Sequence, residues 1–542
     1  MKNTFISTIY IVSILTVNIF LGCSKEDKII KDNNLDEDII EVPVEEKTLF
    51  CSSLLPQTLT TLDQNRAFYW TSGDVLWVDD PTNSGRYICS DSINITGAQA
   101  SSNFIVNKVF PKNITSTQVY YTGQNSNSTT SGLKVTIAQE QNQSIPNDAS
   151  HIATSGDCGT ALAVRQDDGR FNFKLNHKAA YLMLNPYWDS SVDGSETKLR
   201  SITVKSDKPI AGTFDFTDSG LSATPDEGTE SYSITVFCGE DGFPMGNDYG
   251  MAKNGTYIVI HPNAHQLTIE YNFYVIVYQQ RYIEEEGYWE TYPEYDPNGI
   301  MRRTISLRDY AVNSVTQIRH KLKPDAYYTN SFYMWDAKKP FWDGVPLSEI
   351  PYIYADINRE GAPQDNTDER WYNEANVTTA LYSAATMPTF AAFTQYIYNT
   401  DYYWDKTQVW TRDGRVGVGA VWLMQWGYIP LEPEAEGSTP YTCTKVHSNQ
   451  RYSTSKMLYG KPDQENIDKY FYLPALGVYS NVGTMRLLST ACGFYSSTPS
   501  SSSGAYYMVF NSISGLTMNT DLSYRNQGYI AGLRPDGTSW FK

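Results

Sequence analysis

Few residues in this chain have the types and spacing that catalysis or metal binding requires. His261 and His265 lie four residues apart, as do the two zinc ligands of an H-E-x-x-H helix. Pro262 stands between them, no Glu accompanies them, and the flanking sequence reads as strand, turn and strand. We interpret both histidines as structural and expect neither a metal site nor a cofactor.

A second candidate is Gly-Asp-Cys-Gly at residues 156–159, similar to a serine-protease nucleophile motif with Cys in place of Ser. No plausible His and Asp framework accompanies it.

Carboxylates gather at 284–286 and 364–369, and glycoside hydrolysis needs two of them across a cleft. Segment 364–369 offers oxygen ligands but lacks the calcium loop with its terminal Glu. We expect polar surface segments and a non-enzyme, with a carboxylate-dependent glycan hydrolase as an alternative.

Large aromatic side chains near the C-terminus are the candidates for ligand contact. Aromatic faces suit both sugar stacking and protein interfaces, although core packing is the interpretation that we favour for any single one of them. An arginine close to the C-terminus is the polar candidate, with a structural ion pair as its alternative. The predicted ligand surface consists of Trp422, Trp426, Tyr479, Tyr495 and Arg534.

The composition predicts a folded protein that does not bind nucleic acid. Of the 542 residues, 41% are hydrophobic and 14% aromatic, which is unlike a disordered chain. The formal net charge is −18, whereas nucleic-acid binding needs a basic surface.

The N-terminus reads as an export signal. Residues 1–22 combine Lys2 with an apolar stretch. This stretch is short for a transmembrane anchor, and no basic stop-transfer cluster follows it. Gly22 before Cys23 resembles the bacterial lipobox, which implies cleavage after Gly22 and lipid, such as palmitate, on Cys23. Residues 23–46 are an acidic tether. Six cysteines then remain, and their pairing cannot be read from spacing.

Beyond residue 47 the pattern is β almost throughout. In segment 255–283 a short apolar run, a His-Pro-Asn turn and a long apolar run predict two strands. The exception is 387–399, where Thr389 can cap a helix with Phe390 and Phe393 on one face. We therefore expect a mainly β protein whose last part is α+β.

Residues 47–325 resemble the fimbrillin-like pilins, which are lipoprotein precursors of bacterial fimbriae. The resemblance rests on the order of four segments: Trp70–Val78, Phe171–Leu184, Leu199–Ser206 and Gly255–Tyr271. It implies two tandem transthyretin-like β-sandwiches, at 47–190 and 191–325.

The resemblance also implies assembly by strand exchange. Proteolysis removes an N-terminal strand in that family, and a strand of a neighbouring subunit fills the groove. The basic residues at which this chain could be processed are Lys47 and Arg66.

Residues 345–542 resemble the Fibrobacter succinogenes major paralogous domain, which is akin to C-type-lectin-like folds. The matching segments are Met387–Phe393, Tyr470–Ser480, Gly493–Phe510 and Gly528–Asp536. Residues 326–344 would be a linker. The resemblance implies that the Ser-rich run at 496–504, linker-like by composition, is a loop inside this domain.

Together these features predict a surface lipoprotein of a Gram-negative outer membrane or fimbria. We expect a tip or accessory pilin that acts in adhesion through the lectin-like domain. No donor strand follows the last predicted strand, which favours the tip. Expected partners are other pilin subunits, a surface glycan or protein, and the membrane through Cys23. The alternative is an outer-membrane-anchored glycan-binding lipoprotein outside any pilus.

Overall fold

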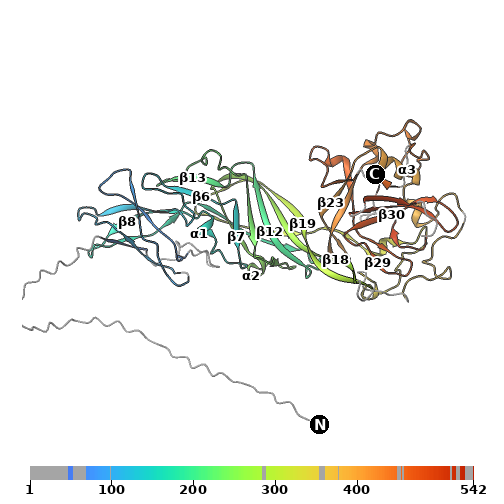
Figure 1. Ribbon diagram of the computed structural model, residues 1–542, viewed down its shortest axis with the longest axis horizontal. Coiled ribbons are helices and arrows are strands. Elements are labelled where there is room, and N and C mark those ends of the chain that lie inside the picture. The colour runs from blue at the N-terminus through green and yellow to red at the C-terminus, as the bar shows by residue number, and fades with distance from the viewer. Residues whose placement is uncertain are drawn as a thin grey trace, which may run out of the picture. The chain divides into compact units, whose positions relative to one another are not determined.

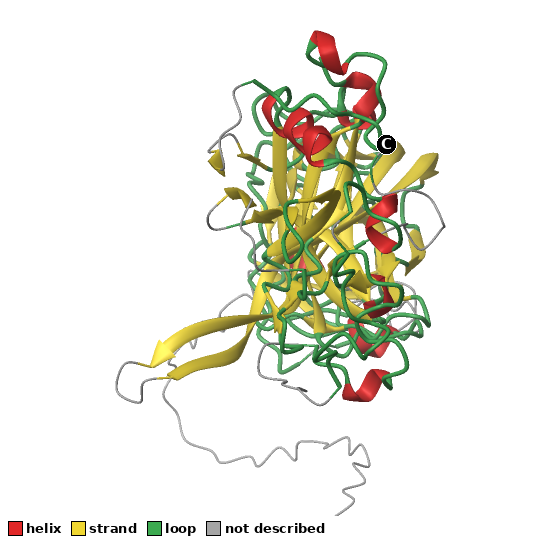
Figure 2. Ribbon diagram, turned by 90° about the vertical axis from the view of Figure 1, so that its right-hand side faces the viewer, coloured by secondary structure: helices red, strands yellow, loops and turns green. Residues whose placement is uncertain are grey.

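The computed structural model describes residues 47–52, 69–97, 99–283, 288–352, 361–375, 377–448, 453–454, 457–512, 515–519, 525–531 and 541. These residues form a mainly β protein (Figure 1), which confirms the predicted fold class. Strands dominate and helices are short (Figure 2). Within the described residues, no helix has the length and apolar character needed to cross a membrane.

The first large sheet is built mostly from the N-terminal third of the chain. It has eight strands in the order β3-β2-β5-β8-β9-β1-β4, with β10 paired to β8. Strand β4 shows the alternation that burial of one face requires, because Phe104 and Val106 are buried and the residues between them are exposed. The buried faces form what we call the first core. The strands are β1 Thr48–Ser52, β2 Trp77–Asp79, β3 Tyr87–Cys89, β4 Asn103–Val106, β5 Ser116–Tyr121, β8 Gly159–Arg165, β9 Phe171–Phe173 and β10 Asn176–His177.

A small sheet separates the first core from a second one. Its order is β17-β11-β20, from Thr256–Ile260, Ala180–Trp188 and Val315–Leu322. Tyr257 faces the first core and Ile258 the second. A strand covered on both faces must be apolar without alternation, which explains the unbroken apolar runs in these segments.

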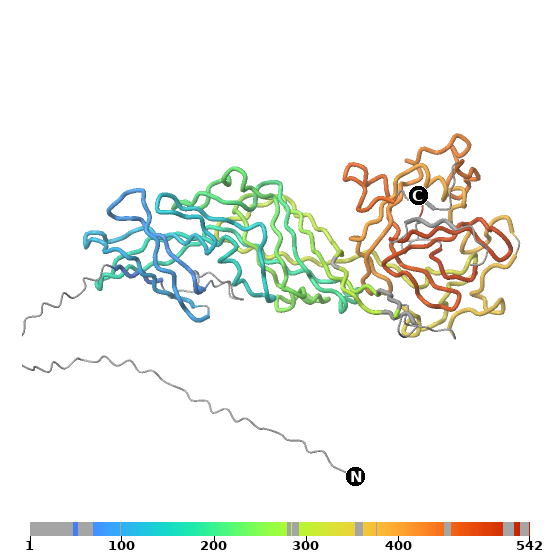
Figure 3. Tube along the Cα trace, viewed as in Figure 1, coloured from blue at the N-terminus to red at the C-terminus, as the bar shows by residue number. Residues whose placement is uncertain are grey.

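Strands from before residue 190 complete sheets formed by later residues. Strand β6 (Lys134–Ile137) pairs with β13 (Gly212–Thr217), and β7 (Glu140–Gln143) pairs with β15 (Ser233–Cys238). In Figure 3, blue-green and green segments of the chain lie side by side in this part of the molecule. These pairings cross the predicted division at residue 190, because they join segments far apart in sequence.

An eleven-stranded sheet joins the second core to the C-terminal part. Its main path is β27-β24-β23-β19-β18-β12-β15-β7. Strands β18 and β19 form a long antiparallel hairpin, and the side chains near its tip lie outside the described residues. Ile300 of β19 pairs with Gln408 of β23, and Val409 packs into the second core. Besides β7 and β15, its strands are β12 Thr197–Ser206, β16 Phe243–Pro244, β18 Asn263–Ile283, β19 Tyr288–Tyr310, β21 Asp325–Tyr327, β23 Tyr402–Arg412, β24 Arg415–Met424, β26 Met457–Tyr459 and β27 Tyr470–Pro474. Strand β14 (Gly220–Leu221) belongs to a separate three-stranded sheet of order β14-β13-β6.

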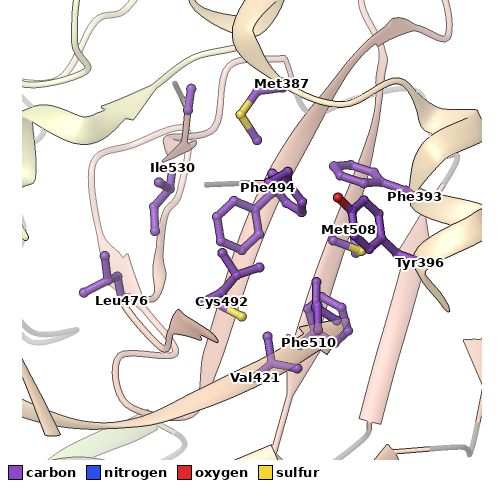
Figure 4. Packing of buried hydrophobic residues seen from close by; sticks show 14 of the residues in the cluster. Met387, Phe393, Tyr396, Val421, Leu476, Cys492, Phe494, Met508, Phe510 and Ile530 are labelled. Atoms are coloured by element: carbon purple, nitrogen blue, oxygen red, sulfur yellow. The ribbon is translucent and has the colours of Figure 1, made fainter. Parts of the chain in front are cut away.

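The C-terminal core contains the only predicted helix and the Ser-rich hairpin. Helix α3 (Phe390–Tyr398) begins as predicted, with the Thr389 side chain accepting a hydrogen bond from the Ala392 amide. Eight of its nine residues are buried, so the helix is covered all round rather than on one face. Figure 4 shows its Phe393 and Tyr396 in one cluster with Phe494 and Met508.

The Ser-rich run lies inside this module, as predicted. Strands β30 (Ala491–Pro499) and β31 (Ala505–Asn511) form an antiparallel hairpin, and residues 500–504 make its turn. The other elements are β22 Phe332–Tyr333, β25 Ser453–Thr454, β28 Val478–Tyr479, β29 Met485–Arg486, β32 Gly515–Asn519, β33 Tyr529–Ile530, α1 Ile152–Ser155, α2 Met251–Asn254 and the 3-10 turns η1 Thr329–Ser331, η2 Leu347–Glu349, η3 Ser383–Thr386, η4 Trp426–Tyr428, η5 Pro433–Ala435 and η6 Ile467–Lys469.

Residues 326–344 do not form the predicted linker. This segment supplies fully buried side chains to the C-terminal module, among them Phe332, Met334, Trp335 and Phe341. The Lys and Pro residues at 338–340 suggested a hinge by composition, but the aromatic residues around them need a core in which to bury their surface.

Candidate functional site

Four of the five residues of the predicted ligand surface are described, and all four are buried. Trp422 and Trp426 are 9% and 8% exposed, and Tyr479 and Tyr495 are 0% and 1% exposed. Arg534 lies outside the described residues. The alternative of core packing therefore holds for the four aromatic residues, and a ligand cannot stack on them without unfolding the module.

Their polar atoms are also satisfied within the protein. The Trp422 indole N–H donates to Asp405 Oδ2 (3.2 Å) and that of Trp426 to the Ser438 carbonyl (2.8 Å). The Tyr479 and Tyr495 hydroxyls donate to the carbonyls of Pro351 (2.9 Å) and Gln527 (3.2 Å). Buried Tyr and Trp usually find such partners, so these contacts describe a core rather than a site.

Of the predicted N-terminal sites, only one lies in the described residues. Cys23, Gly22 and Arg66 are outside them, and their predicted roles stay predictions. Lys47 is exposed and directly precedes β1. The six remaining cysteines are all described, and none of them forms a disulfide.

Strand β1 lies between β9 and β4, the strand at one edge of the first sheet. It runs antiparallel to β4, where Phe50 lies opposite Phe104, and parallel to β9, where Phe50 lies opposite Phe171. The Phe50 side chain is fully buried. Its ring centroid is 5.0 Å from that of Phe171 and 5.5 Å from that of Phe110. Only five residues long, β1 thus closes a gap between two strands and fills a pocket in the first core.

Side-chain hydrogen bonds hold both ends of β1. Thr48 Oγ1 donates to the Lys108 carbonyl (2.7 Å) and accepts from the Phe110 amide (3.2 Å). At the other end, Ser52 Oγ accepts from the indole N–H of Trp70 (2.9 Å). These partners fix the register of the strand.

A polar and aromatic cavity opens in the C-terminal module. Its volume is ≈ 350 Å³. It is lined by Asp336, Lys338, Asn366, Thr367, Asp368, Glu369, Trp371, Tyr372, Asn373, Glu374 and Tyr382. Most of this lining comes from segment 366–374, which contains the acidic loop considered above, and the rest from segments 336–338 and 382.

The buried carboxylate of Asp336 holds the segments that line the cavity together. It is 1% exposed, and its carboxylate accepts hydrogen bonds from the Asn373 side chain (2.8 Å) and the Leu381 amide (2.7 Å). It also accepts from the amide of Tyr382. The backbone at Asp336 is left-handed, with φ 53°, a conformation that Asp tolerates better than most residues. This one buried carboxylate therefore joins all three lining segments.

The rim carries Glu374 and two aromatic residues. Glu374 accepts from the Trp371 indole N–H (2.9 Å) and from the Asn366 amide (3.0 Å), one bond on each carboxylate oxygen. The Trp371 and Tyr372 rings pack 4.9 Å apart. Burial, and next the charge of Glu374, raises the pKa of Tyr372. Trp371 is half-buried and Glu374 is exposed, so both can reach a ligand.

The other two acidic side chains of the rim are paired with cations. A hydrogen bond from Arg370 lowers the pKa of Asp368, and one from Lys339 lowers the pKa of Glu369. A general acid in glycoside hydrolysis needs the opposite shift. Within the described residues, no group of three His, Cys, Asp or Glu side chains could hold a metal ion.

Arg525 connects this cavity to the Ser-rich turn. The side chain is 1% exposed and lies 3.9 Å above the Trp335 ring. Its guanidinium donates to the carbonyls of Asn373 (2.6 Å) and Gly504 (3.0 Å), and also to that of Ser501. Burial lowers the pKa of Arg525. Sequence reasoning missed this residue, because a single Arg in a polar loop carries no signal of a buried position.

The histidine and cysteine candidates have structural contacts. His261 Nε2 donates to the Ser222 carbonyl and His265 Nε2 to the His261 carbonyl, both at 3.0 Å. In the Gly-Asp-Cys-Gly segment, burial raises the pKa of the Cys158 thiol well above its usual value, so the reactive thiolate is disfavoured. Its neighbour Asp157 is the residue that contacts a histidine, His177, at 2.7 Å.

Comparison with known proteins gives low similarities. No family model and no curated protein matches this chain. A candidate cell adhesion protein from Bacteroides ovatus is 13% identical, with 51% of this chain and 93% of that chain covered and a TM-score of 0.29. The fimbrial anchor protein Mfa2 from Porphyromonas gingivalis is 8% identical over 49% of this chain and 100% of its own, with a TM-score of 0.21.

A fimbrial protein from Bacteroides ovatus covers more of the chain. It is 10% identical, with 90% of this chain and 99% of that chain covered and a TM-score of 0.23. At these TM-scores and identities, the similarities do not by themselves establish a shared fold or function.

Proposed function

We propose that this protein is a tip or accessory subunit of a fimbria, exported as a lipoprotein and acting in cell adhesion. The observation that carries the proposal is the position of β1. Loss of this strand would expose the unpaired edges of β4 and β9 and the pocket that Phe50 fills. Such a groove is what strand addition requires, because main-chain hydrogen bonds give affinity and alternate side chains fill pockets.

The two candidate processing sites have different consequences. A cut after Lys47 would leave β1 (Thr48–Ser52) at the start of the mature chain. A cut after Arg66 would separate β1 from the rest of the sheet, which resumes at β2. Strand exchange therefore requires the cut after Arg66, and the cut after Lys47 fits a chain that keeps its own strand, such as a membrane-anchored lipoprotein.

The C-terminal module is proposed as the adhesive part. It contains the ≈ 350 Å³ cavity with aromatic and polar lining, whereas the first core contains the strand suited to assembly. This separation lets one end of the chain join a neighbour while the other contacts a surface. The resemblance of the sequence to a lectin-like domain agrees with that role.

We propose no catalytic activity. The carboxylates Asp368 and Glu369 have lowered pKa values because Arg370 and Lys339 donate hydrogen bonds to them. Both are therefore held as anions and cannot donate a proton near neutral pH.

Processing variants test the assembly proposal. In a fimbriated strain that carries this chain, Arg66→Ala should abolish its incorporation into sheared fimbriae, because β1 cannot leave. Lys47→Ala is the matched control and should assemble normally. Mass spectrometry of the surface form should find no residues before position 67. Incorporation of the Arg66→Ala variant, or a surface form that retains lipidated Cys23, would refute strand exchange at β1.

A further inference from the structure

We propose that the cavity around Trp371, Glu374 and Tyr382 is a binding site for uncharged, hexose-containing glycans. This inference rests on the adhesive role proposed above and names its ligand class and its residues. The argument uses the size of the cavity, its aromatic surfaces, its hydrogen-bonding groups and its charge.

The cavity has the size and position of a small-ligand site. Its volume of ≈ 350 Å³ lies in the range of about 300–1,000 Å³ typical of such sites. The lining segments are held by the buried carboxylate of Asp336 and the buried guanidinium of Arg525. A ligand therefore meets a preformed surface, which lowers the ordering cost of binding.

Aromatic side chains of the cavity offer apolar surface to a sugar ring. Tyr382 is 43% exposed, and Asp336 holds its backbone amide. Trp371 packs against Tyr372, and its indole N–H is fixed on Glu374. Rigid amphipathic side chains of this kind give contact area at a low cost in conformational entropy.

Polar groups beside these rings match the hydroxyls of a sugar. Each carboxylate oxygen of Glu374 already accepts one hydrogen bond, from Trp371 or Asn366. Each oxygen keeps a second lone pair that can accept from a hydroxyl, and such charge-assisted bonds are the stronger ones. Asn366 uses one donor of its amide on Glu374, and its oxygen is a further acceptor.

The charge of the lining selects against acidic glycans. Two of the four lining carboxylates, Asp368 and Glu369, are paired with Arg370 and Lys339. The remaining carboxylates, Asp336 and Glu374, outnumber Lys338, which is the one cation among the lining residues. The whole chain carries a formal charge of −18. Sialylated or sulfated sugars would therefore meet like charges at short range, which disfavours their binding.

The Ser-rich turn supports this cavity rather than forming it. None of residues 500–504 lines the cavity, yet the carbonyls of Ser501 and Gly504 share Arg525 with Asn373. Replacement of the turn should thus weaken glycan binding only as far as it displaces Arg525.

The test is a binding assay with the full mature chain on immobilised neutral, sialylated and sulfated oligosaccharides. We expect binding to neutral glycans. Trp371→Ala and Tyr382→Ala should each weaken it by about tenfold or more, and Glu374→Gln by several-fold. The matched control is Tyr428→Ala, a similarly exposed tyrosine of the same module, 54% exposed, which should bind as the wild type does. Circular dichroism and thermal unfolding verify that each variant is folded.

Three outcomes would overturn the inference. They are preferential binding of sialylated or sulfated glycans, unchanged binding in all three cavity variants, and adhesion only to a deglycosylated protein surface. Incorporation of the same variants into fimbriae is measured in parallel. Normal incorporation without glycan binding refutes the ligand class alone, whereas failure of the wild type to enter fimbriae refutes the fimbrial function.

Discussion

Replacement of Phe50 by Ala tests how strongly β1 is bound in the unprocessed protein. The Phe50 side chain is fully buried, with ring centroids of Phe171 and Phe110 at 5.0 and 5.5 Å. Truncation of a buried Phe to Ala costs about 3–5 kcal/mol of unfolding free energy. Because two aromatic pairs are lost as well, we expect about 4 kcal/mol. If residues 46–542 unfold as one unit, this loss corresponds to a melting temperature lower by roughly 4 °C.

Calorimetry of the uncleaved protein measures this loss directly. Hydrogen exchange followed by mass spectrometry should show faster exchange in β4 and β9, which pair with β1. The matched control is Leu49→Ala, because Leu49 is half-buried and lies opposite Ile105, which is 40% exposed. We expect its cost to stay below about 1.5 kcal/mol, as for partial burial of one aliphatic side chain.

Two results would refute the conclusion that Phe50 anchors β1 in the first core. One is a loss of unfolding free energy below about 1.5 kcal/mol for Phe50→Ala, and the other is an equal loss for Phe50→Ala and Leu49→Ala. The assembled form gives a second comparison. If β1 leaves after a cut at Arg66, the Phe50→Ala and wild-type chains become identical in the fimbria and must melt at the same temperature.

Three further predictions concern pH, a buried cation and a helix cap. Burial lowers the pKa of His151 to about 4, so the unfolded chain takes up a proton near pH 6.5 that the folded chain does not. Stability should therefore fall as the pH drops from 7 to 4, and His151→Gln should remove up to about 3 kcal/mol of that fall in urea unfolding. Arg525→Met leaves buried carbonyls without their donor and should cost about 2–4 kcal/mol, with faster proteolysis at residues 500–504. Thr389→Ala removes the cap of α3 and should cost about 1 kcal/mol in thermal unfolding.

Each of these predictions has a control. Burial also lowers the pKa of His261, His265 and His320, so the quantity to compare is the difference between wild type and His151→Gln at each pH. A constant difference would contradict the assignment. Arg525→Lys keeps the charge without the planar fork and should recover little stability. Thr389→Ser keeps the capping hydroxyl, so its stability in thermal unfolding should match that of the wild type. If the Ser and Ala variants lose equal stability, the loss comes from packing of the Thr389 side chain and not from capping.

Local sequence patterns predicted individual elements well. The helix that Thr389 caps and the two strands expected in segment 255–283 depend on residues close in sequence, so their signals are readable along the chain. The unbroken apolar run in β17 can also be read in the sequence. Its cause cannot, because it is the presence of two cores on the two faces of one sheet.

Boundaries and site residues were predicted poorly. Strands β6 and β7 pair with strands about 75 to 100 residues later, and no local pattern encodes that choice. Segment 326–344 was read as a linker although it is core. Similarly, an exposed and a buried tryptophan have the same letter in the sequence, so the sequence does not distinguish the buried Trp422 from the half-buried Trp371 of the cavity.

The sequence by itself determined that this chain is a mainly β protein with a short helix in its C-terminal part, whereas the export signal at the N-terminus stays a prediction. These properties follow from composition and from periods of two or four residues, which neighbouring residues impose on one another. Only the tertiary structure decided which aromatic residues are buried and which face the cavity. It also revealed that a buried Arg525 joins the Ser-rich turn to that cavity, and that β1 closes a gap between β9 and β4. Burial and strand pairing depend on contacts between distant segments, and those exist only once the chain is folded.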